Sequence, residues 1–237
     1  MKKKYQSIAI IPARKGSKGI KNKSIKNFCK KPLIAWSIET ALESSIDRVV
    51  VNTNCEKIRK IAIHYGAEAP YLRNDSLAQD NSSIESVLVD QLNFLYKTEK
   101  YTPDILALIL PTSPFRNKYD INNAIKMYKS KSLTSVVSVT KATANLNPEW
   151  MLKNDNGKVK LYSGKSVSEI KTRRQDLSEA YIRNDFIYLL NIKNLYQKKP
   201  QLYGSKIGLL IKELNRPDVD INTKLDWEIA EKIFQRI

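Results

Sequence analysis

A glycine-containing basic loop follows the first apolar run of the chain. Residues Ile8–Ile11 are all apolar and are followed by Pro12, which is typical of a buried strand. In the loop, Gly16 and Gly19 let backbone N–H groups approach oxyanions. Positive charge and a hydroxyl come from four side chains of the same loop, Arg14, Ser17, Lys18 and Lys23. The loop therefore has the chemistry to hold a polyphosphate.

This loop matches neither of the two common phosphate-binding patterns. The spacing G-x-x-x-x-G-K-[ST] is absent, and so is G-x-G-x-x-G. The alternative is a solvated basic surface loop. Its place directly after the first buried strand favours phosphate binding over that alternative.

Two aspartates near the end of the chain could hold a metal ion. Asp218 and Asp220 are two positions apart, so in an extended segment both carboxylates point to the same side. Neighbouring carboxylates repel each other and are stabilised by a cation. Hard oxygen ligands beside a phosphate loop favour Mg²⁺ shared with substrate phosphates. The alternative is a turn that caps the last helix, for which Asn222 or Thr223 would also serve.

Two further segments carry polar groups that could bind a substrate. Thr112 and Ser113 lie between two prolines, where an ordinary turn and helix cap is the alternative. The segment 171–188 contains several arginines, whose guanidinium groups bind carboxylates in a bidentate manner. A solvated charged rim is the alternative there.

Histidine and cysteine chemistry is limited in this chain. His64 is the only histidine, and its place near a predicted helix end, away from the segments above, indicates a structural role. A Ser-His-Asp hydrolase and a histidine-ligated zinc site are therefore excluded. Cys29 and Cys55 are too far apart in a chain of this length to suggest a disulfide framework.

The elements that must position these residues alternate between strands and helices. Apolar runs predict strands at 8–11, 48–52, 105–110, 135–139, 187–190 and 207–211, and helical spacing predicts helices at 32–42, 56–65, 82–96, 119–129 and 225–234. From about 140 to 180 the chain is polar and rich in turn signals, which indicates an insertion with short strands. The pattern predicts a mostly parallel α/β sheet covered on both faces. Such sheets bind ligands at the carboxyl ends of their strands, so the loops after Ile11 and Leu110 and the turn near Asp218 should meet there.

The charge of the chain favours anionic partners. There are 41 lysines and arginines against 24 aspartates and glutamates in 237 residues, a formal net charge of +17. The basic residues are scattered, with Lys2–Lys4 as the longest run, and no helix has a concentrated basic face. A nucleic-acid-binding module is therefore a less favoured alternative. With no signal peptide and no apolar run near the roughly 20 residues of a membrane span, we expect a cytoplasmic protein without membrane or nucleic-acid partners.

Taken together, these segments resemble the acylneuraminate cytidylyltransferases, also called CMP-sialic acid synthetases. The family includes enzymes for related acids such as legionaminic and pseudaminic acid. No single motif is unique, but the ordered set is specific and spans nearly the whole chain. The matching segments are 10–14 with 16–19, 72–73 with 77–80, 111–116, 174–177 and 218–221.

The resemblance implies a Rossmann-like nucleotide-binding domain over 1–139 and 183–237. The segment 140–182 would be an inserted dimerisation element of a homodimer, reaching toward the site of the partner. The implied reaction joins CTP and an acidic nine-carbon sugar to give a CMP-sugar and diphosphate with the help of Mg²⁺. Alternatives are another acidic sugar, such as Kdo or pseudaminic acid, or an inactive scaffold relative.

The resemblance also implies roles for individual residues. Nucleotide-binding positions would be Ala13, Arg14, Gly16, Ser17, Lys18, Lys23, Ser24, Arg73 and Ser83. Sugar-binding positions would be Thr112, Ser113, Arg174 and Arg183. Asp218 and Asp220 would bind the metal, and together with Arg14 and Lys23 they would be the catalytic residues.

Five positions depart from the family pattern. Lys15 replaces a small residue and Ser24 a frequent asparagine, so the contacts of the loop need not copy the family. Asn54 and Asp185 stand where aspartate and glycine are common, which leaves the local geometry open. Leu110 replaces a glutamine and favours a less hydroxylated or deoxy sugar. Together with Arg183-Asn184, which resembles the legionaminate-type branch, this points to a diacetamido nonulosonate.

Overall fold

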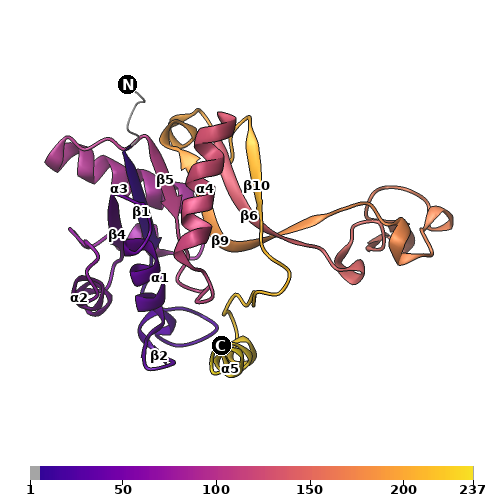
Figure 1. Cartoon of the computed structure of the whole chain (residues 1–237), viewed down its shortest axis with the longest axis horizontal. Coiled ribbons are helices and arrows are strands. Elements are labelled where there is room, and N and C mark those ends of the chain that lie inside the picture. The colour runs from indigo at the N-terminus through magenta and orange to yellow at the C-terminus, as the bar shows by residue number, and fades with distance from the viewer. Residues whose placement is uncertain (1–5, 237) are drawn as a thin grey trace.

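A six-stranded sheet is the frame of the structure, a computed structural model that describes residues 6–236 (Figure 1). Its strands follow the order β10-β6-β9-β5-β1-β4. Residues 1–5, which include the Lys2–Lys4 run, lie outside the described residues, and so does residue 237. The prediction had included both ends in the nucleotide-binding domain. The bounds of the strands are Ser7–Pro12 for β1, Arg48–Asn52 for β4, Ile105–Leu108 for β5, Ser135–Lys141 for β6, Tyr181–Asn191 for β9 and Ile207–Ile211 for β10.

The sheet is mostly parallel, as predicted, with β9 as the exception. β1 pairs in parallel with β4 and β5, and β6 with β10, whereas β9 is antiparallel to both of its neighbours. The prediction placed a strand only at 187–190; β9 is longer because its first residues pair with the end of β6. The inserted segment leaves the sheet at the carboxyl end of β6 and returns at the same edge. Because no crossover helix carries the chain to the other edge first, the next strand, β9, has to run antiparallel.

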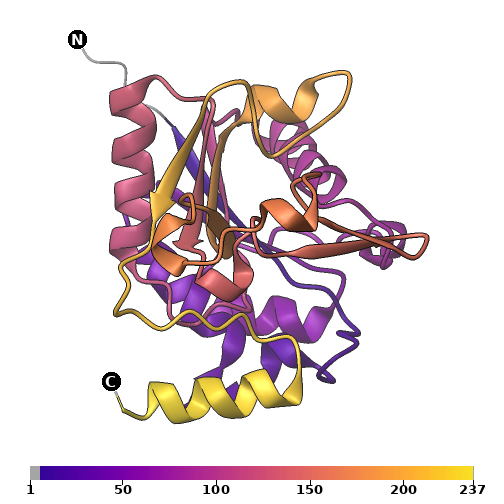
Figure 2. The same ribbon diagram turned by 90° about the vertical axis from the view of Figure 1, so that its right-hand side faces the viewer.

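Helices cover both faces of this sheet (Figure 2). The alternation of side chains along β1 explains why: Ala9 and Ile11 face one apolar cluster, and Ile8 and Ile10 face the other. The first cluster is completed by α1 (Leu33–Leu42), α2 (Glu56–His64) and α4 (Lys118–Lys131), and the second by α3 (Ile84–Glu99). The two clusters make the predicted three-layer α/β arrangement.

None of the helices within residues 6–236 is both long and apolar enough to cross a membrane.

A third apolar cluster lies beneath the carboxyl edge of the sheet and supports the site. The last helix, α5 (Lys224–Phe234), contributes Trp227 and Ala230 to it. The short strands β2 (Asn27–Phe28) and β3 (Lys31–Pro32) present Phe28, whose ring meets Trp227 and Phe234 edge-on. Ile20, Leu33, Phe115, Phe186 and Ile221 complete the cluster. Because its members come from the basic loop, the 110–116 loop, β9 and the acidic segment, it holds these four segments together.

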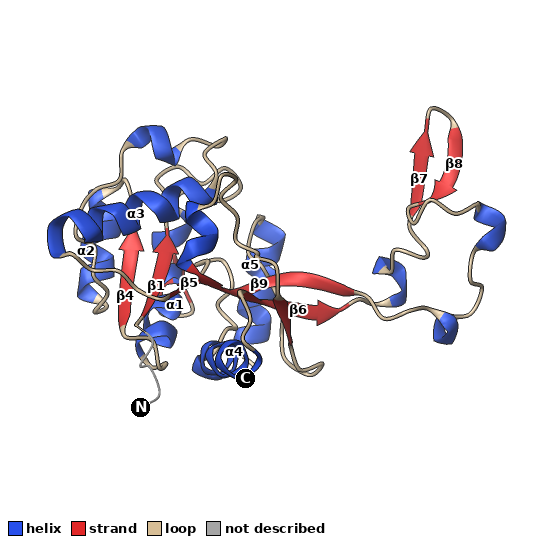
Figure 3. Ribbon diagram, turned by 90° about the horizontal axis from the view of Figure 1, so that it is seen from above, coloured by secondary structure: helices blue, strands red, loops and turns tan. Residues whose placement is uncertain are grey.

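The polar insertion leaves the sheet as an arm, residues 142–180 (Figures 1 and 3). The ends of β6 and β9 pair as a ribbon that carries it outward. The arm contains a two-stranded hairpin, β7 (Leu152–Asp155) with β8 (Lys158–Leu161), and short 3-10 turns. The expectation of short strands in this segment is confirmed.

Ile221 should be a main anchor of the acidic segment. Its side chain is fully buried in the third cluster, and its N–H donates to the carbonyl of Thr112 over 2.9 Å. Replacing it (Ile221→Ala) leaves a cavity and should lower the free energy of unfolding by about 3 kcal/mol, measured by urea denaturation. The control Leu225→Ala alters an exposed leucine of α5 and should change stability by less than about 0.5 kcal/mol. Equal effects of the two variants would contradict this account.

Candidate active site

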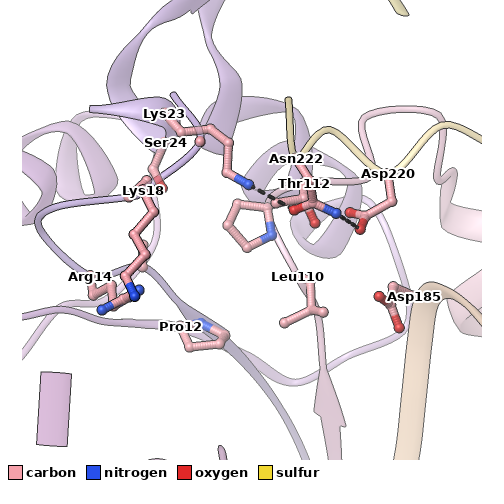
Figure 4. Close-up of a pocket in the computed structure, with 14 residues that line it drawn as sticks. Pro12, Arg14, Lys18, Lys23, Ser24, Leu110, Thr112, Asp185, Asp220 and Asn222 are labelled. Atoms are coloured by element: carbon pink, nitrogen blue, oxygen red, sulfur yellow. Dashed lines mark hydrogen bonds between the residues drawn. The ribbon is translucent and has the colours of Figure 1, made fainter. Parts of the chain in front are cut away.

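Three loops meet in one cleft at the carboxyl edge of the sheet (Figure 4). Its volume is about 580 Å³, and it is lined by parts of the segments 12–24, 110–112 and 220–222, together with Asp185 of β9. The prediction that the loops after Ile11 and Leu110 and the acidic turn converge is therefore confirmed. Their convergence follows from the parallel strands, whose carboxyl ends share one edge.

Glycines shape the basic loop on the wall of this cleft. Gly16 has a φ of +83°, in the left-handed region that glycine adopts without strain. At Gly19 a Cβ atom would lie 2.0 Å from the carbonyl oxygen of Asn222, so only glycine allows this approach to the acidic segment. Asn54 steadies the loop from outside, because its Oδ1 accepts the N–H of Lys15 over 2.8 Å.

Two cations of the loop share one carboxylate. Asp80 lies 2.5 Å from Arg14 Nη2 and 2.5 Å from Lys18 Nζ. These hydrogen bonds, from Lys18 first and then Arg14, hold the pKa of the Asp80 carboxyl below its ordinary value. Both cations are thus directed at one anionic group, an arrangement that would also suit a phosphate.

Lys23 connects the basic loop with the acidic segment. Its Nζ donates to the carbonyl of Ile221 over 2.6 Å and to Asn222 Oδ1 over 3.2 Å. Burial lowers the pKa of Lys23, although the carboxylates of Asp220 and Asp226 act in the opposite direction. Lys23 is thus a partly desolvated cation, and such a charge acts more strongly on an anion than one in water.

Only one aspartate of the predicted metal pair lines the cleft. Asp220 does so; its Oδ2 accepts from Asn222, while its Oδ1 is buried without a hydrogen bond to any described residue. Asp218 instead accepts a hydrogen bond from the hydroxyl of Thr140, since a half-buried carboxylate needs a donor. Of the predicted pair, Asp220 thus lines the cleft, and Asp218 lies beside it in the chain with Thr140 as its hydrogen-bond donor.

The two carboxylates nevertheless influence each other. Burial raises the pKa of Asp218, the hydrogen bond from Thr140 opposes this, and the charges of Asp220 and Asp185 raise it further. Among residues 6–236, no three histidine, cysteine, aspartate or glutamate side chains come together as a metal-binding group.

A smaller hollow of about 250 Å³ adjoins the cleft and shares Pro12 and Arg14 with it. Arg73 lines this hollow; it is 5% exposed, and none of the described residues accepts a hydrogen bond from its Nε. Burial lowers the pKa of Arg73. Ser83 lies next to the lining residues Ser82 and Ile84, and its side chain caps α3 by accepting the N–H of Ser86.

The structure places the remaining candidate residues in two groups. Those that line the cleft are Ala13, Ser17, Ser24 and Thr112. Those that do not are Gly16, Ser113, Arg174 and Arg183.

Each residue of the second group has an evident position. Gly16 has the positive φ of a turn within the loop, and Ser113 is buried within the 110–116 loop. Arg183 donates to the hydroxyl of Tyr203 over 2.7 Å. Arg174 lies on the arm, beside a separate hollow of about 260 Å³.

The sequence analysis assigned no functional role to three residues of the site, which are Asn222, Asp80 and Asp185. Asn222 was considered only as a helix cap, but Thr223 caps α5 together with Asp226, and Asn222 faces the cleft. The spacing Thr-x-x-Asp is a capping box and could have shown this. Asp80 was noticed only as part of a motif. Asp185 has a φ of +56°, a conformation that aspartate tolerates better than most residues.

Comparison with known proteins agrees with this geometry. The family model described as Cytidylyltransferase matches residues 8–226. CMP-N,N'-diacetyllegionaminic acid synthase from Legionella pneumophila is 32% identical over 229 residues, which cover 96% of each chain. Pseudaminic acid cytidylyltransferase from Campylobacter jejuni is 33% identical over 235 residues, with 97% of each chain covered.

The fold also has solved counterparts. The structure of CMP:2-keto-3-deoxy-manno-octonic acid synthetase complexed with CTP superimposes with a TM-score of 0.71 at 16% identity, and covers 98% of this chain and 99% of the other. At that identity the likeness concerns the Rossmann-like fold alone. The family match over most of the sequence, together with the two relatives, shows that the chain belongs to the cytidylyltransferase family.

Proposed function

We propose that this protein transfers CMP from CTP to the anomeric hydroxyl of an acidic nine-carbon sugar. The sugar oxygen bonds to the α-phosphorus, the bond from that phosphorus to the bridging oxygen breaks, and diphosphate leaves. The observation that carries the proposal is that a basic glycine loop and Asp220 line one cleft, and that one carboxylate oxygen of Asp220 is buried without a hydrogen bond from any described residue. The relatives, whose names specify a legionaminic acid and a pseudaminic acid, support a nonulosonic acid as the acceptor.

The basic loop would hold the triphosphate. Arg14, Lys18 and Lys23 supply positive charge, and the backbone around Ala13 and Gly16 with the hydroxyls of Ser17 and Ser24 would complete the binding surface. Negative charge builds on the bridging oxygens as diphosphate leaves. Fixed cations in a partly desolvated site stabilise that charge, and we assign this catalytic role to Arg14 and Lys23.

The cytidine would occupy the adjoining hollow. Arg73 offers a buried Nε without a partner among the described residues, and Ser83 lies at the rim. Pro12 and Arg14 line both spaces, so a nucleotide can extend from one into the other.

The sugar would lie toward the 110–113 loop. Thr112 lines that part of the cleft, and the next residue, Ser113, is buried. Arg183 is close in sequence to Asp185 of the cleft wall and could reach a sugar only by leaving Tyr203. Arg174 is on the arm, so we assign it to the cleft of a partner subunit.

A divalent cation fits the acidic side of the cleft. Asp220 has a buried carboxylate oxygen without a partner among the described residues, and Asp218 has a carboxyl whose pKa is raised by burial. A bound cation would stabilise both carboxylates in their charged form. Oxygen ligands shared with phosphates favour Mg²⁺, held by these two aspartates. The ion would neutralise charge on the phosphates.

The reaction requires only small anionic partners, which is consistent with the net charge of +17. Neither a nucleic acid nor a membrane is needed. Cys29 and Cys55 are both free thiols, the state that a reducing compartment maintains, and we therefore place the enzyme in the cytoplasm.

We further propose that the protein is a homodimer joined through the arm. An isolated two-stranded hairpin is marginally stable in water, so the arm should be covered. Leu152 and Val159 share one face of the β7–β8 hairpin and are 58% and 53% exposed. Apolar side chains exposed in this way mark an association surface, and a second copy of the chain would cover it.

The central test measures diphosphate release from CTP with a panel of sialic, legionaminic, pseudaminic and Kdo acids. We expect turnover with a nonulosonic acid and its loss in EDTA. Asp220→Asn should lower kcat roughly a hundredfold, because it removes a charged ligand of the cation that would neutralise the reacting phosphates. Glu228→Gln, which alters an exposed residue of α5, should leave kcat unchanged. A fully active Asp220→Asn enzyme would refute the metal assignment.

Asp218→Asn should separate stability from activity. Because burial raises the pKa of the Asp218 carboxyl, the folded protein binds this proton more tightly than the unfolded chain. The wild type therefore loses stability as the pH rises from about 4 through the raised pKa. Asparagine carries no such charge, so the variant should gain stability relative to wild type over that window, and its turnover should fall. The measurement is urea unfolding without metal at a series of pH values, and a difference independent of pH would contradict the assignment.

Disruption of the hairpin surface should release the monomer. The double variant Leu152→Asp, Val159→Asp introduces charge into the proposed contact, so light scattering should report the mass of one 27.2 kDa chain where the wild type shows twice that mass. Tyr96→Asp, on an exposed position of α3, is the control and should remain dimeric. A wild-type monomer at micromolar concentration would disprove the proposal.

A further inference from the structure

Asp185 projects into the cleft from β9, across from Leu110 (Figure 4). Its neighbours in sequence point elsewhere: Asn184 is buried and donates to Thr140, and Phe186 is buried in the third apolar cluster. Asp185 is therefore the residue through which this part of β9 reaches the substrate space. None of the roles proposed above uses its carboxylate.

One buried guanidinium fixes the two walls relative to each other. Arg116 is 4% exposed, and its Nη2 donates to the carbonyl of Leu110 over 2.8 Å and to that of Asp185 over 3.2 Å. Its Nε donates to the carbonyl of Phe186, and its Nη1 to the hydroxyl of Ser37 over 3.0 Å. Because a single nitrogen joins both carbonyls, the separation between the Leu110 wall and the Asp185 wall is set by the core and not by a mobile loop.

The carboxylate of Asp185 is oriented but only half satisfied. Its Oδ1 accepts a hydrogen bond from the hydroxyl of Tyr188. Within residues 6–236, no group donates to its Oδ2 and no cation forms an ion pair with it. Arg183, the nearest cation in sequence, is engaged by Tyr203. One oxygen thus remains available to a ligand in the cleft.

We propose that Asp185 and Leu110 together recognise an acetamido group of the sugar, an inference that rests on the proposed function. An ionised carboxylate only accepts hydrogen bonds, so the ligand group beside Asp185 has to be a donor. Leu110 offers an apolar surface and no polar atom of its side chain. An acetamido group presents both complements, an N–H for Asp185 and a methyl for Leu110.

The same charge orients the whole substrate. A sugar acid carries its own carboxylate, which Asp185 repels and the cations of the basic loop attract. The acid end, next to the anomeric carbon, is thereby directed toward the triphosphate, and the acetamido end toward Asp185. Asp185 is a specificity residue in this arrangement and takes no part in bond making.

Two variants test this role without disturbing the backbone. Asparagine and glycine both accept the positive φ of 56° at this position, so Asp185→Asn and Asp185→Gly should fold as the wild type does. The substrates are two nonulosonic acids that differ in carrying acetamido groups or hydroxyls at the same carbons. Glu99→Gln is the control, because Glu99 pairs with Arg48 at the opposite, amino-terminal edge of the sheet.

We expect Asp185→Gly to raise the KM for the acetamido sugar about tenfold, the loss of one hydrogen bond to a charged group. The preference for acetamido over hydroxyl should shrink in proportion. The KM of Asp185→Asn for the acetamido sugar should lie between those of wild type and Asp185→Gly, since its amide oxygen still accepts a weaker hydrogen bond. The KM for CTP and the Mg²⁺ concentration at half-maximal rate should not change in either variant.

An unchanged ratio of KM values in Asp185→Gly would overturn the proposal. A shift in the Mg²⁺ requirement with no change in the KM for sugar would also overturn it, and would make Asp185 a metal ligand. If the wild type turned over no sugar acid, the proposed function itself would fail. Calorimetry would then still decide the inference from the affinities for the two sugars. If wild type and Asp185→Gly bound the acetamido sugar with equal affinity, the inference would be refuted.

Discussion

Lys23 joins the two ends of the chain across the cleft, and most of the site depends on this contact. Its ammonium group binds the carbonyl of Ile221 and the side chain of Asn222, 198 and 199 positions away. The approach is possible because Gly19 has no side chain to collide with the carbonyl of Asn222. The third apolar cluster brings a loop rich in lysine and a segment rich in aspartate together, and the Lys23 contact joins their polar surfaces as two walls of one cleft.

The arm explains why β9 runs antiparallel to its neighbours in the six-stranded sheet and, through it, the sugar side of the cleft. A chain that leaves the sheet after β6 and returns at the same edge has to enter β9 in the reverse direction. The carboxyl edge of the parallel strands is consequently where β9 begins. This is why Asp185, early in β9, lies beside Leu110, which follows β5. A helical crossover would have brought the other end of the strand to the cleft.

Local patterns predicted the elements well and their polar partners poorly. The runs at 48–52 and 207–211 match β4 and β10 to the residue, because each contains an apolar run. β4 is buried, whereas β10 is an edge strand whose Ile207, Leu209 and Ile211 are exposed. The beginning of β9 has no such pattern, since it pairs outside the core. The convergence of three loops followed from the topology of parallel sheets. The turn of Asp218 toward Thr140, and the pairing of Asp80 with Arg14 and Lys18, depend on contacts between distant segments that no local pattern contains.

The distribution of charge in the cleft suggests how a substrate would enter it. Arg14 and Lys18 are not bare cations, because Asp80 already pairs with both. Lys23 is likewise occupied by a carbonyl and an amide oxygen. A triphosphate would therefore exchange one set of oxygen partners for another, and the loop would not need to be assembled around it. On the opposite wall, Asp220 and Asp185 each retain an oxygen without a partner among the described residues. The basic wall is thus preorganised for the nucleotide, while the acidic wall keeps acceptors open, and this asymmetry gives the two substrates different places in one cleft.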